Sequence, residues 1–324
     1  MSKGNEVVLE LKNVTKIFKT HNNNMLTACR DISLNFYKGE TLGIVGESGC
    51  GKSTLMKMIM QLEDPTDGEI IYRGQNITKL KGEKLRLNRR NIQMVFQDPT
   101  TSFNPRMKIR DIICEPLINF GLIKRCERDE VAKKYLDMVE LSEDFLHRYP
   151  HNMSGGQRQR IGIARALALN PEVIIFDEST SALDVSIQKS ILELITKLQR
   201  ENDITIGFVC HDIALVTQIC HQVVVMYLGN IVEIIPGEKL YKYATHPYTK
   251  TLISSVFDLN MDFSKKINCI SGDVPSPIDR PIGCPFENCC ESAMEICKKQ
   301  IPKLRELSKN HYIACHLDLG EKNE

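Results

Sequence analysis

The residues best suited to chemistry form one short run, Gly46-Glu47-Ser48-Gly49-Cys50-Gly51-Lys52-Ser53, with Thr54 next. The run fits the pattern G-x-x-x-x-G-K-[ST], with an apolar segment before it and a helical pattern after it. Glycines let successive backbone N–H groups point inward at a helix N-terminus, where they bind phosphate. Lys52 would then reach the β- and γ-phosphates of a nucleotide, and the Ser53 hydroxyl would ligate Mg²⁺. The alternative is a flexible glycine turn.

A second run, residues 173–178, is apolar for four residues and ends in Asp177 and Glu178. Alone, it is as typical of an ordinary core strand as of a catalytic one. At the carboxyl edge of a parallel sheet that also carries a phosphate loop, Asp177 can hold the Mg²⁺ shell. The neighbouring Glu178 can then orient and deprotonate an attacking water. We therefore predict Glu178 as the general base.

A third run, Met153-Ser154-Gly155-Gly156-Gln157, opens a strong helical pattern. Ser154 is the expected N-cap, and the two glycines leave backbone N–H groups accessible. Helix capping alone explains the run. With Arg158 and Arg160 one turn later, it also fits a second phosphate-binding helix start, one that the chain's own phosphate loop cannot use.

Cysteines gather near the end of the chain, with four between residues 283 and 297 and Cys315 shortly after. The N-terminal segment has no apolar leader, and no later apolar run is long enough to span a bilayer, which favours a cytosolic protein. Disulfides rarely persist in the cytosol, so these cysteines indicate metal binding or redox chemistry more than a disulfide staple.

The composition gives a broad frame for these runs. The chain has 324 residues, 42% hydrophobic and 26% charged, with a formal net charge of +1. These values exclude a disordered chain and a broadly nucleic-acid-binding one. The basic run at residues 79–90 favours a solvated helix face over an acidic partner.

The surrounding pattern is that of an α/β fold. Residues 7–18 alternate like an edge strand, and buried strands are predicted at 41–45, 69–72, 91–98, 173–178 and 205–212. Helices are expected over residues 111–146 and 186–202, and a hairpin over 222–235 that turns at Gly229-Asn230. The strong periodicity fades after residue 257, which is where we place the main boundary.

The segments GESGCGKST, VFQDP, MSGGQRQR, VIIFDE, SALD and VCHD, in this order and spacing, resemble the nucleotide-binding subunit of ABC transporters. The resemblance covers residues 6–257. It implies a P-loop NTPase domain over residues 1–257 with a parallel core sheet, an antiparallel β subdomain and a helical subdomain at about 99–168. A small Cys-rich extension would follow at 258–324.

The resemblance also implies roles for single residues. ATP would be sandwiched in a head-to-tail dimer between one phosphate loop and the Ser154-Gly155-Gly156-Gln157 segment of the other subunit. Gln97 would sense Mg²⁺ and the attacking water, Asp184 would line the dimer seam, and His211 would hydrogen-bond the γ-phosphate. Phe18 would stack on adenine, although a core position suits this residue equally well.

The branch of the family is indicated by VFQDPTTSFNPRM, the segment 246–249 and GDVPSPIDRPIGCPF, which resemble the ATP-binding subunits of oligopeptide and dipeptide importers, whose relatives also carry nickel. The resemblance implies a [4Fe–4S] cluster on Cys284, Cys290, Cys297 and Cys315. Their C-x5-C-x6-C-x17-C spacing fits neither short zinc dyads nor the compact ferredoxin run. Four thiolates suit either metal, so zinc and free thiols stay as alternatives.

The implied function is that of an ATPase subunit that powers peptide import from the cytoplasmic side of the membrane. Its implied partners are two transmembrane permease subunits, a second homologous ATP-binding subunit and, indirectly, an extracellular peptide-binding protein. One rival is a non-transport ABC ATPase that acts on nucleic acid, but the sequence has neither a long coiled-coil insertion nor a second nucleotide-binding unit. Another rival, an iron–sulfur redox enzyme, lacks any further substrate-pocket constellation.

Overall fold

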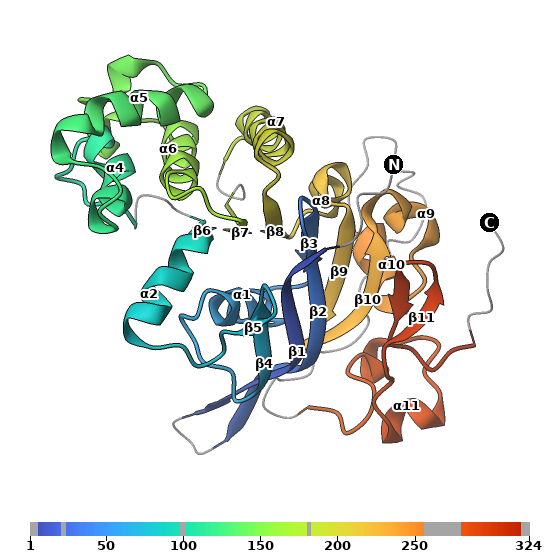
Figure 1. The fold of residues 1–324 in the computed structure, drawn as a ribbon. Helices are drawn as coiled ribbons and strands as arrows, with labels where there is room; N and C mark the ends of the chain where they lie inside the picture. The colour runs from blue at the N-terminus through green and yellow to red at the C-terminus, as the bar shows by residue number, and fades with distance from the viewer. Residues whose placement is uncertain (1–5, 21–23, 98–101, 180–182, 256–279, 319–324) are drawn as a thin grey trace. The chain divides into compact units, whose positions relative to one another are not determined.

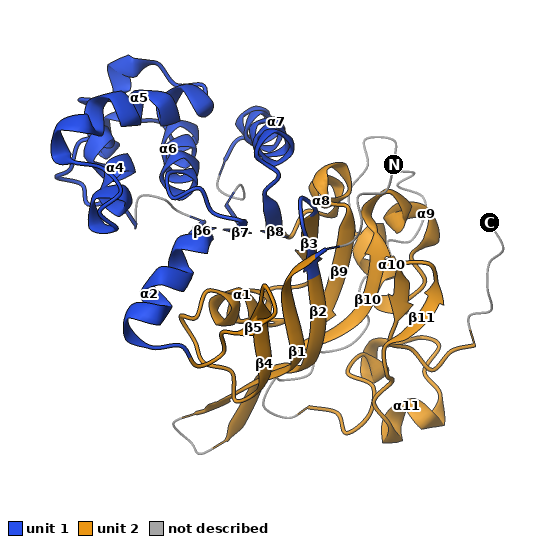
Figure 2. Ribbon diagram, viewed as in Figure 1, with its two compact units in different colours: residues 1–6, 36–40, 80–209 blue, residues 7–35, 41–79, 210–324 orange. Residues whose placement is uncertain are grey.

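The computed structural model describes residues 6–20, 24–97, 102–179, 183–255 and 280–318. The chain forms two compact units that interleave along the sequence (Figure 2). Unit 1 comprises residues 1–6, 36–40 and 80–209, and unit 2 comprises residues 7–35, 41–79 and 210–324. Among the described residues, no helix is both long and apolar enough to cross a membrane.

Unit 2 contains a four-stranded sheet in the order β2-β1-β4-β5 (Figure 1). Its strands are β1 (Val7–Lys19), β2 (Met25–Tyr37), β4 (Asp67–Tyr72) and β5 (Gln75–Asn76). The prediction that β1 is an edge strand is wrong, because β2 lies beside it on one side and β4 pairs with it antiparallel on the other. Its alternating pattern reflects one buried face, which interior antiparallel strands also have.

Unit 2 also contains β3 (Thr41–Val45), which runs parallel to β9 (Gln222–Tyr227). The predicted hairpin joins β9 to β10 (Asn230–Pro236), but its turn is Leu228-Gly229, one residue earlier than expected. Both turn residues have positive φ, as a tight two-residue hairpin requires. Beyond β10 the antiparallel pairing continues to β12 (His311–Ile313) and β11 (Arg305–Ser308).

The helices of unit 2 flank these strands. They are α1 (Lys52–Ile59), α8 (Ile213–Ile219), α9 (Leu240–Tyr243), α10 (Pro247–Ser254) and α11 (Glu295–Lys299), with short 3₁₀ turns at Gly237–Lys239 and Glu287–Cys289. α1 follows β3 directly after the glycine run, so the predicted strand, turn and helix are confirmed.

Unit 1 is built on three parallel strands with β7 in the middle: β6 (Ile92–Val95), β7 (Val173–Asp177) and β8 (Thr205–Val209). Its helices are α2 (Gly82–Asn91), α4 (Ile109–Asn119), α5 (Arg128–Met138), α6 (Gly155–Leu167) and α7 (Val185–Asn202). Three 3₁₀ turns, Arg125–Glu127, Glu143–Phe145 and Pro150–Asn152, interrupt the helical stretch. The basic run forms α2, whose one buried residue is Asn88, which confirms a solvated helix.

Parallel strands with flanking helices and a separate antiparallel sheet confirm the predicted α/β class. The predicted domain boundary near residue 257 falls within 256–279, and the predicted start of the helical subdomain at 99 falls within 98–101. Both ranges lie outside the described residues, so these domain limits stay predictions.

Candidate nucleotide-binding site

The predicted phosphate loop connects β3 to α1 in unit 2, and its backbone can be formed only with glycine at two positions. Gly46 and Gly51 have φ values of 150° and 107°. A Cβ on Gly51 would collide with the carbonyl oxygen of Ala28, and one on Gly46 would collide with that of Met226. The backbones of the surrounding strands therefore lie in direct contact with the loop backbone, which explains why the sequence has glycines at these two positions.

The side chain of Lys52 lies inside the phosphate loop. This side chain is buried, and Nζ donates to the carbonyl oxygens of Gly46 at 2.7 Å and Glu47 at 2.8 Å. The Lys52 ammonium thus lies within the turn where a phosphate-binding lysine is required. Cys50 is also buried, and burial raises the pKa of its thiol, as expected for a small packing residue rather than a catalytic thiol.

His211 lies beside the start of the phosphate loop. Its Nδ1 is 3.3 Å from the carbonyl oxygen of Gly46, and the residue is exposed. The fold therefore brings together two predicted site elements that are more than a hundred residues apart in sequence. Sequence reasoning did not identify Tyr248 as a site residue, yet its hydroxyl accepts a hydrogen bond from the backbone N–H of Glu47 at 3.0 Å.

The predicted catalytic acids lie in unit 1. Asp177 is the last residue of β7, and Glu178 follows it with a positive φ of 49°, an unusual conformation for a non-glycine residue. The backbone N–H of Glu178 donates to the carbonyl oxygen of Val209. Gln97 comes two residues after β6 and is exposed. Since β6 and β7 are parallel neighbours, Gln97 and the two acids lie at the same sheet edge.

The third run starts α6 in unit 1 as a capping box. Ser154 Oγ accepts from the N–H of Gln157 at 3.4 Å, and Gln157 Oε1 accepts from the N–H of Ser154 at 3.0 Å. Ser154 and Gly155 are exposed, whereas a Cβ on Gly156 would collide with Ile187 of α7. This helix start is thus accessible and closely packed against α7 on one side.

The arginines after this run connect α6 to neighbouring segments of unit 1. Arg158 Nε donates to the carbonyl oxygen of Pro150, and Arg160 Nη1 donates to that of Val139.

Two further predicted site residues are at least partly accessible to solvent. Asp184 is exposed at the N-cap position of α7. Phe18 on β1 is only partly buried, with Lys16 Nζ 4.8 Å from its ring centroid, so it is not a core residue.

The four cysteines predicted to bind a cluster lie in the described segment 280–318 of unit 2 as free thiols. Cys284 and Cys297 are buried, and the N–H of Cys284 donates to the carbonyl oxygen of Cys297 at 2.7 Å. The pKa of Cys284 is raised to about 12, mainly by burial; the nearby Cys297, Cys315 and Cys290 add to the rise, and a backbone hydrogen bond at Phe286 opposes it. The four thiols are therefore close enough to affect one another.

Within the described ranges, however, no three His, Cys, Asp or Glu side chains form a group that could hold a metal ion. The predicted cluster therefore stays a prediction.

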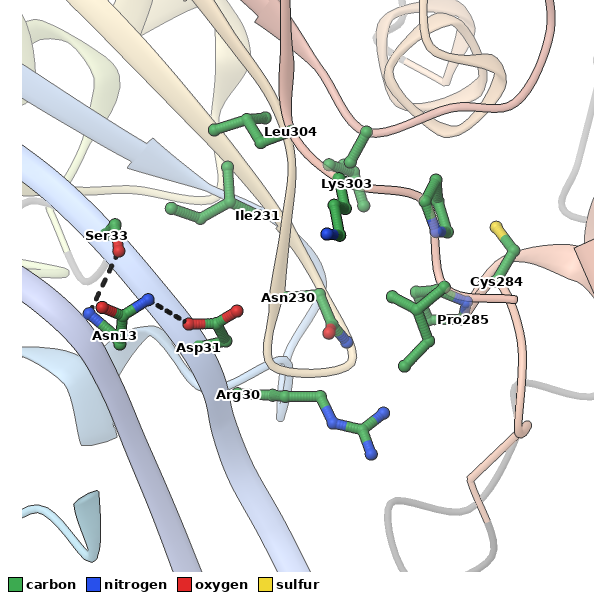
Figure 3. A pocket seen from close by; sticks show the side chains of 14 residues that line it. Asn13, Arg30, Asp31, Ser33, Asn230, Ile231, Cys284, Pro285, Lys303 and Leu304 are labelled. Carbon is green, nitrogen blue, oxygen red and sulfur yellow. Dashed lines mark hydrogen bonds between the residues drawn. The ribbon is translucent and has the colours of Figure 1, made fainter. Parts of the chain in front are cut away.

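A hollow of about 580 Å³ lies in unit 2 between the antiparallel sheet and residues 284–314 (Figure 3). Its polar groups bond to one another: Asn13 Nδ2 donates to Asp31 Oδ1 at 2.6 Å, and the N–H of Asn13 donates to Ser33 Oγ at 3.0 Å. Its lining includes Cys284 but none of the residues predicted to bind ATP.

Comparison with known proteins agrees with this arrangement. Residues 29–181 match the family described as "ABC transporter", and residues 232–297 match "Oligopeptide/dipeptide transporter, C-terminal region". The chain is 47% identical to the oligopeptide transport ATP-binding protein AppF of Bacillus subtilis, over 96% of this chain and 98% of the relative. The chain belongs to the ABC transporter family of ATP-binding subunits. It is thus an ATP-hydrolysing transporter subunit.

Other relatives of this ABC subunit agree. It is 43% identical to the oligopeptide transport ATP-binding protein OppF of Haemophilus influenzae, over 97% of this chain and 98% of that protein. Among solved structures, the ATP-binding cassette MJ0796, a dimer bound to ADP and Pi, matches with a TM-score of 0.64 and 33% identity, over 70% of this chain and 98% of that one. CbiO1 of Clostridium perfringens matches with a TM-score of 0.65 and 26% identity, over 73% and 91% of the two chains.

Proposed function

We propose that this ABC subunit hydrolyses ATP to drive the import of short peptides, on the cytoplasmic side of a membrane transporter. The observation that carries the proposal is its likeness, over nearly its whole length, to oligopeptide transport ATP-binding proteins. The match of residues 232–297 to the oligopeptide/dipeptide transporter region supports the same substrate class.

In the proposed reaction, the phosphate loop and Lys52 bind the ATP phosphates, and Ser53, Gln97 and Asp177 surround Mg²⁺. Glu178 accepts a proton from the attacking water. The support is local: Lys52 already points into the loop, and Gln97 shares a sheet edge with the two acids. A base directly after the last residue of a parallel strand has the usual position for this chemistry.

We further propose that ATP binds between two subunits, with the α6 start of one facing the phosphate loop of the other. The support is the accessibility of Ser154 and Gly155 and the dimeric state of the similar cassette MJ0796. Asp184 would then line the seam, His211 would bond the γ-phosphate, and Phe18 would stack on adenine. The expected assembly is a heterodimer with a homologous subunit, on two permease subunits that receive peptide from an extracellular binding protein.

The thiols of Cys284, Cys290, Cys297 and Cys315 would hold a [4Fe–4S] cluster, or zinc as the alternative. The support is the donor set itself: neighbouring thiols of the set contribute to the raised pKa values of Cys284, Cys290 and Cys315. No step of ATP hydrolysis depends on this site. Iron, acid-labile sulfide and zinc content of anaerobically purified protein, with Cys290→Ser as the control, decides between cluster, zinc and free thiols.

Glu178→Gln tests the ATPase and the substrate class together. Loss of a general base lowers turnover by roughly 10²–10⁴-fold while ATP binding is kept. In the source cells, uptake of a radiolabelled tripeptide should fall with it, and Glu193→Gln on the exposed face of α7 should change neither. Normal peptide uptake in cells whose Glu178→Gln protein has lost turnover would exclude peptides as the substrate.

A further inference from the structure

Tyr248 connects the phosphate loop to the C-terminal part of unit 2. Its side chain is fully buried, and its hydroxyl accepts the hydrogen bond from the backbone N–H of Glu47 at 3.0 Å. Burial raises the pKa of Tyr248, so the hydroxyl stays neutral. The second residue of the phosphate loop is therefore held by a side chain 201 residues away in sequence.

The segment that carries Tyr248 is itself firmly anchored. His246 Nδ1 accepts from the N–H of Tyr248 at 3.1 Å and caps α10. The carboxylate of Glu233, on β10, accepts from the N–H groups of Thr245 at 2.8 Å and His246 at 3.2 Å, and it lies 2.8 Å from His311 Nε2. Glu233 and His246 are buried, so this anchor is shielded from water.

The ring of Tyr248 packs in an aromatic cluster. Its centroid lies 4.5 Å from that of Tyr227 and 5.4 Å from that of Phe286, and Tyr227 and Phe286 meet edge-on at 5.3 Å. Phe286 is buried and lies in the cysteine loop, residues 284–290, between two of the cysteines predicted to bind metal. The cysteine loop thus contacts the phosphate loop through one intervening side chain.

We propose that Tyr248 is a positioning residue for the phosphate loop, and that Phe286 holds Tyr248 in place, so that packing of the cysteine loop sets nucleotide affinity. The Glu47 N–H is fixed by the tyrosine hydroxyl, and the backbone N–H groups that follow it are fixed as a consequence. This inference rests on the proposed nucleotide binding at residues 46–53.

The first test is the dissociation constant for MgADP, which is not hydrolysed, so that binding is measured without turnover. Tyr248→Phe keeps the ring and removes the hydroxyl, which should weaken MgADP binding about tenfold, because a lost hydrogen bond costs about 1.4 kcal/mol. Tyr227→Phe is the matched control. It removes a buried hydroxyl from the same cluster, one that lies 4.0 Å from Cys289 Sγ, so binding should not change.

The second test is a double-mutant cycle with Phe286→Leu. Phe286→Leu alone should weaken MgADP binding about threefold to fivefold, and it should have no further effect in the Tyr248→Phe background, because its effect passes through the tyrosine hydroxyl. Melting temperatures of all variants identify any loss of folding.

The outcomes separate this inference from the proposed function. Wild-type protein that binds no MgADP would contradict the nucleotide site itself. Wild-type binding with equal affinities for Tyr248→Phe and Tyr227→Phe would contradict the positioning role. Additive effects of Phe286→Leu and Tyr248→Phe would contradict the link to the cysteine loop.

Discussion

The phosphate loop of unit 2 and the α6 start of unit 1 are both rich in glycine and both open a helix, yet they are supported differently. The phosphate loop is enclosed: Lys52 is buried, and neighbouring strands and Tyr248 contact its backbone. The α6 start is exposed, and its capping bonds are made by its own side chains, Ser154 and Gln157. The first is the proposed nucleotide site and is built by its own unit, whereas the second presents its N–H groups outward.

This difference indicates that two similar glycine-rich runs can have different functions in one ATPase. A loop built into the surrounding fold should control whether nucleotide binds at all. An accessible helix start should matter only once a second subunit supplies the nucleotide. Substitutions at the two places should therefore separate binding from turnover.

The largest effect is expected for Lys52→Ala. The substitution removes the ammonium that should neutralise the β- and γ-phosphates, so MgATP affinity should fall by at least about a hundredfold, and turnover should be lost. Calorimetric titration and phosphate release measure the two effects. Lys57→Ala, on the exposed side of the same helix α1, is the control and should bind normally. Nucleotide binding that survives Lys52→Ala would mean that the loop is not the binding site.

The next effect is expected for Gly155→Asp at the α6 start. A Cβ on Gly155 meets only Leu183 at 3.3 Å, so the side chain can be accommodated. Its carboxylate would repel the γ-phosphate of a nucleotide held by the other subunit, and turnover should fall by roughly a hundredfold or more. The MgADP dissociation constant should stay at the wild-type value. Gly155→Ala, which adds the Cβ without the charge, should lower turnover far less than Gly155→Asp and should leave MgADP binding unchanged. Weakened MgADP binding by the aspartate variant would remove the distinction between the two regions.

The same contrast explains how much the sequence could predict. The phosphate loop, the strand that ends at Asp177 and the capping box of α6 are local, since each depends on residues within one strand–turn–helix unit. Each was therefore predicted at its observed place. The N-cap of α6 could be predicted because Ser154 forms its hydrogen bond with Gln157, only three positions away.

The supports of the phosphate loop could not be predicted in this way. Tyr248 meets Glu47 across 201 residues, and His311 meets Glu233 across 78, so no local pattern contains either pair. β2 was not predicted, because polar residues such as Arg30 and Asp31 interrupt its apolar positions. Without β2, its neighbour β1 was misread as an edge strand. Pairing between distant segments therefore limited the prediction.

A smaller effect is expected from acid on the supports of the phosphate loop. Burial lowers the pKa of His246 from 6.5 to about 4, although Glu233 opposes the shift. Between pH 6.5 and 4, His246 therefore binds a proton in the unfolded protein but not in the folded protein. The contribution of His246 to stability is fully present above pH 6.5 and is lost as the pH falls through this window. The loss from this group should reach about 2 kcal/mol at pH 5.

Urea denaturation at several pH values measures this loss. His246→Asn keeps a side-chain acceptor for the N-terminus of α10 but does not titrate, so its stability should change less between pH 6.5 and 5. The contribution of Glu233 to the pH dependence of stability can be separated from that of His246. Burial alone would raise the pKa of Glu233, but hydrogen bonds from His311 and the Thr245 amide hold it below its usual value, so its contribution is lost only at lower pH. Parallel pH profiles for wild type and His246→Asn would contradict the assignment.

The smallest effect is expected for Ser154→Ala. The substitution removes the side-chain acceptor of the α6 capping box, which typically costs about 1 kcal/mol of stability. Because the cap is exposed and its bond to the Gln157 N–H is long at 3.4 Å, the cost should lie at or below that value. The MgADP dissociation constant should not change, since the phosphate loop does not depend on this cap. Ser154→Thr retains the acceptor oxygen and should restore stability in urea denaturation. A stability loss several times larger would mean that the α6 start is supported by more than its own residues, and the contrast with the enclosed phosphate loop would then fail.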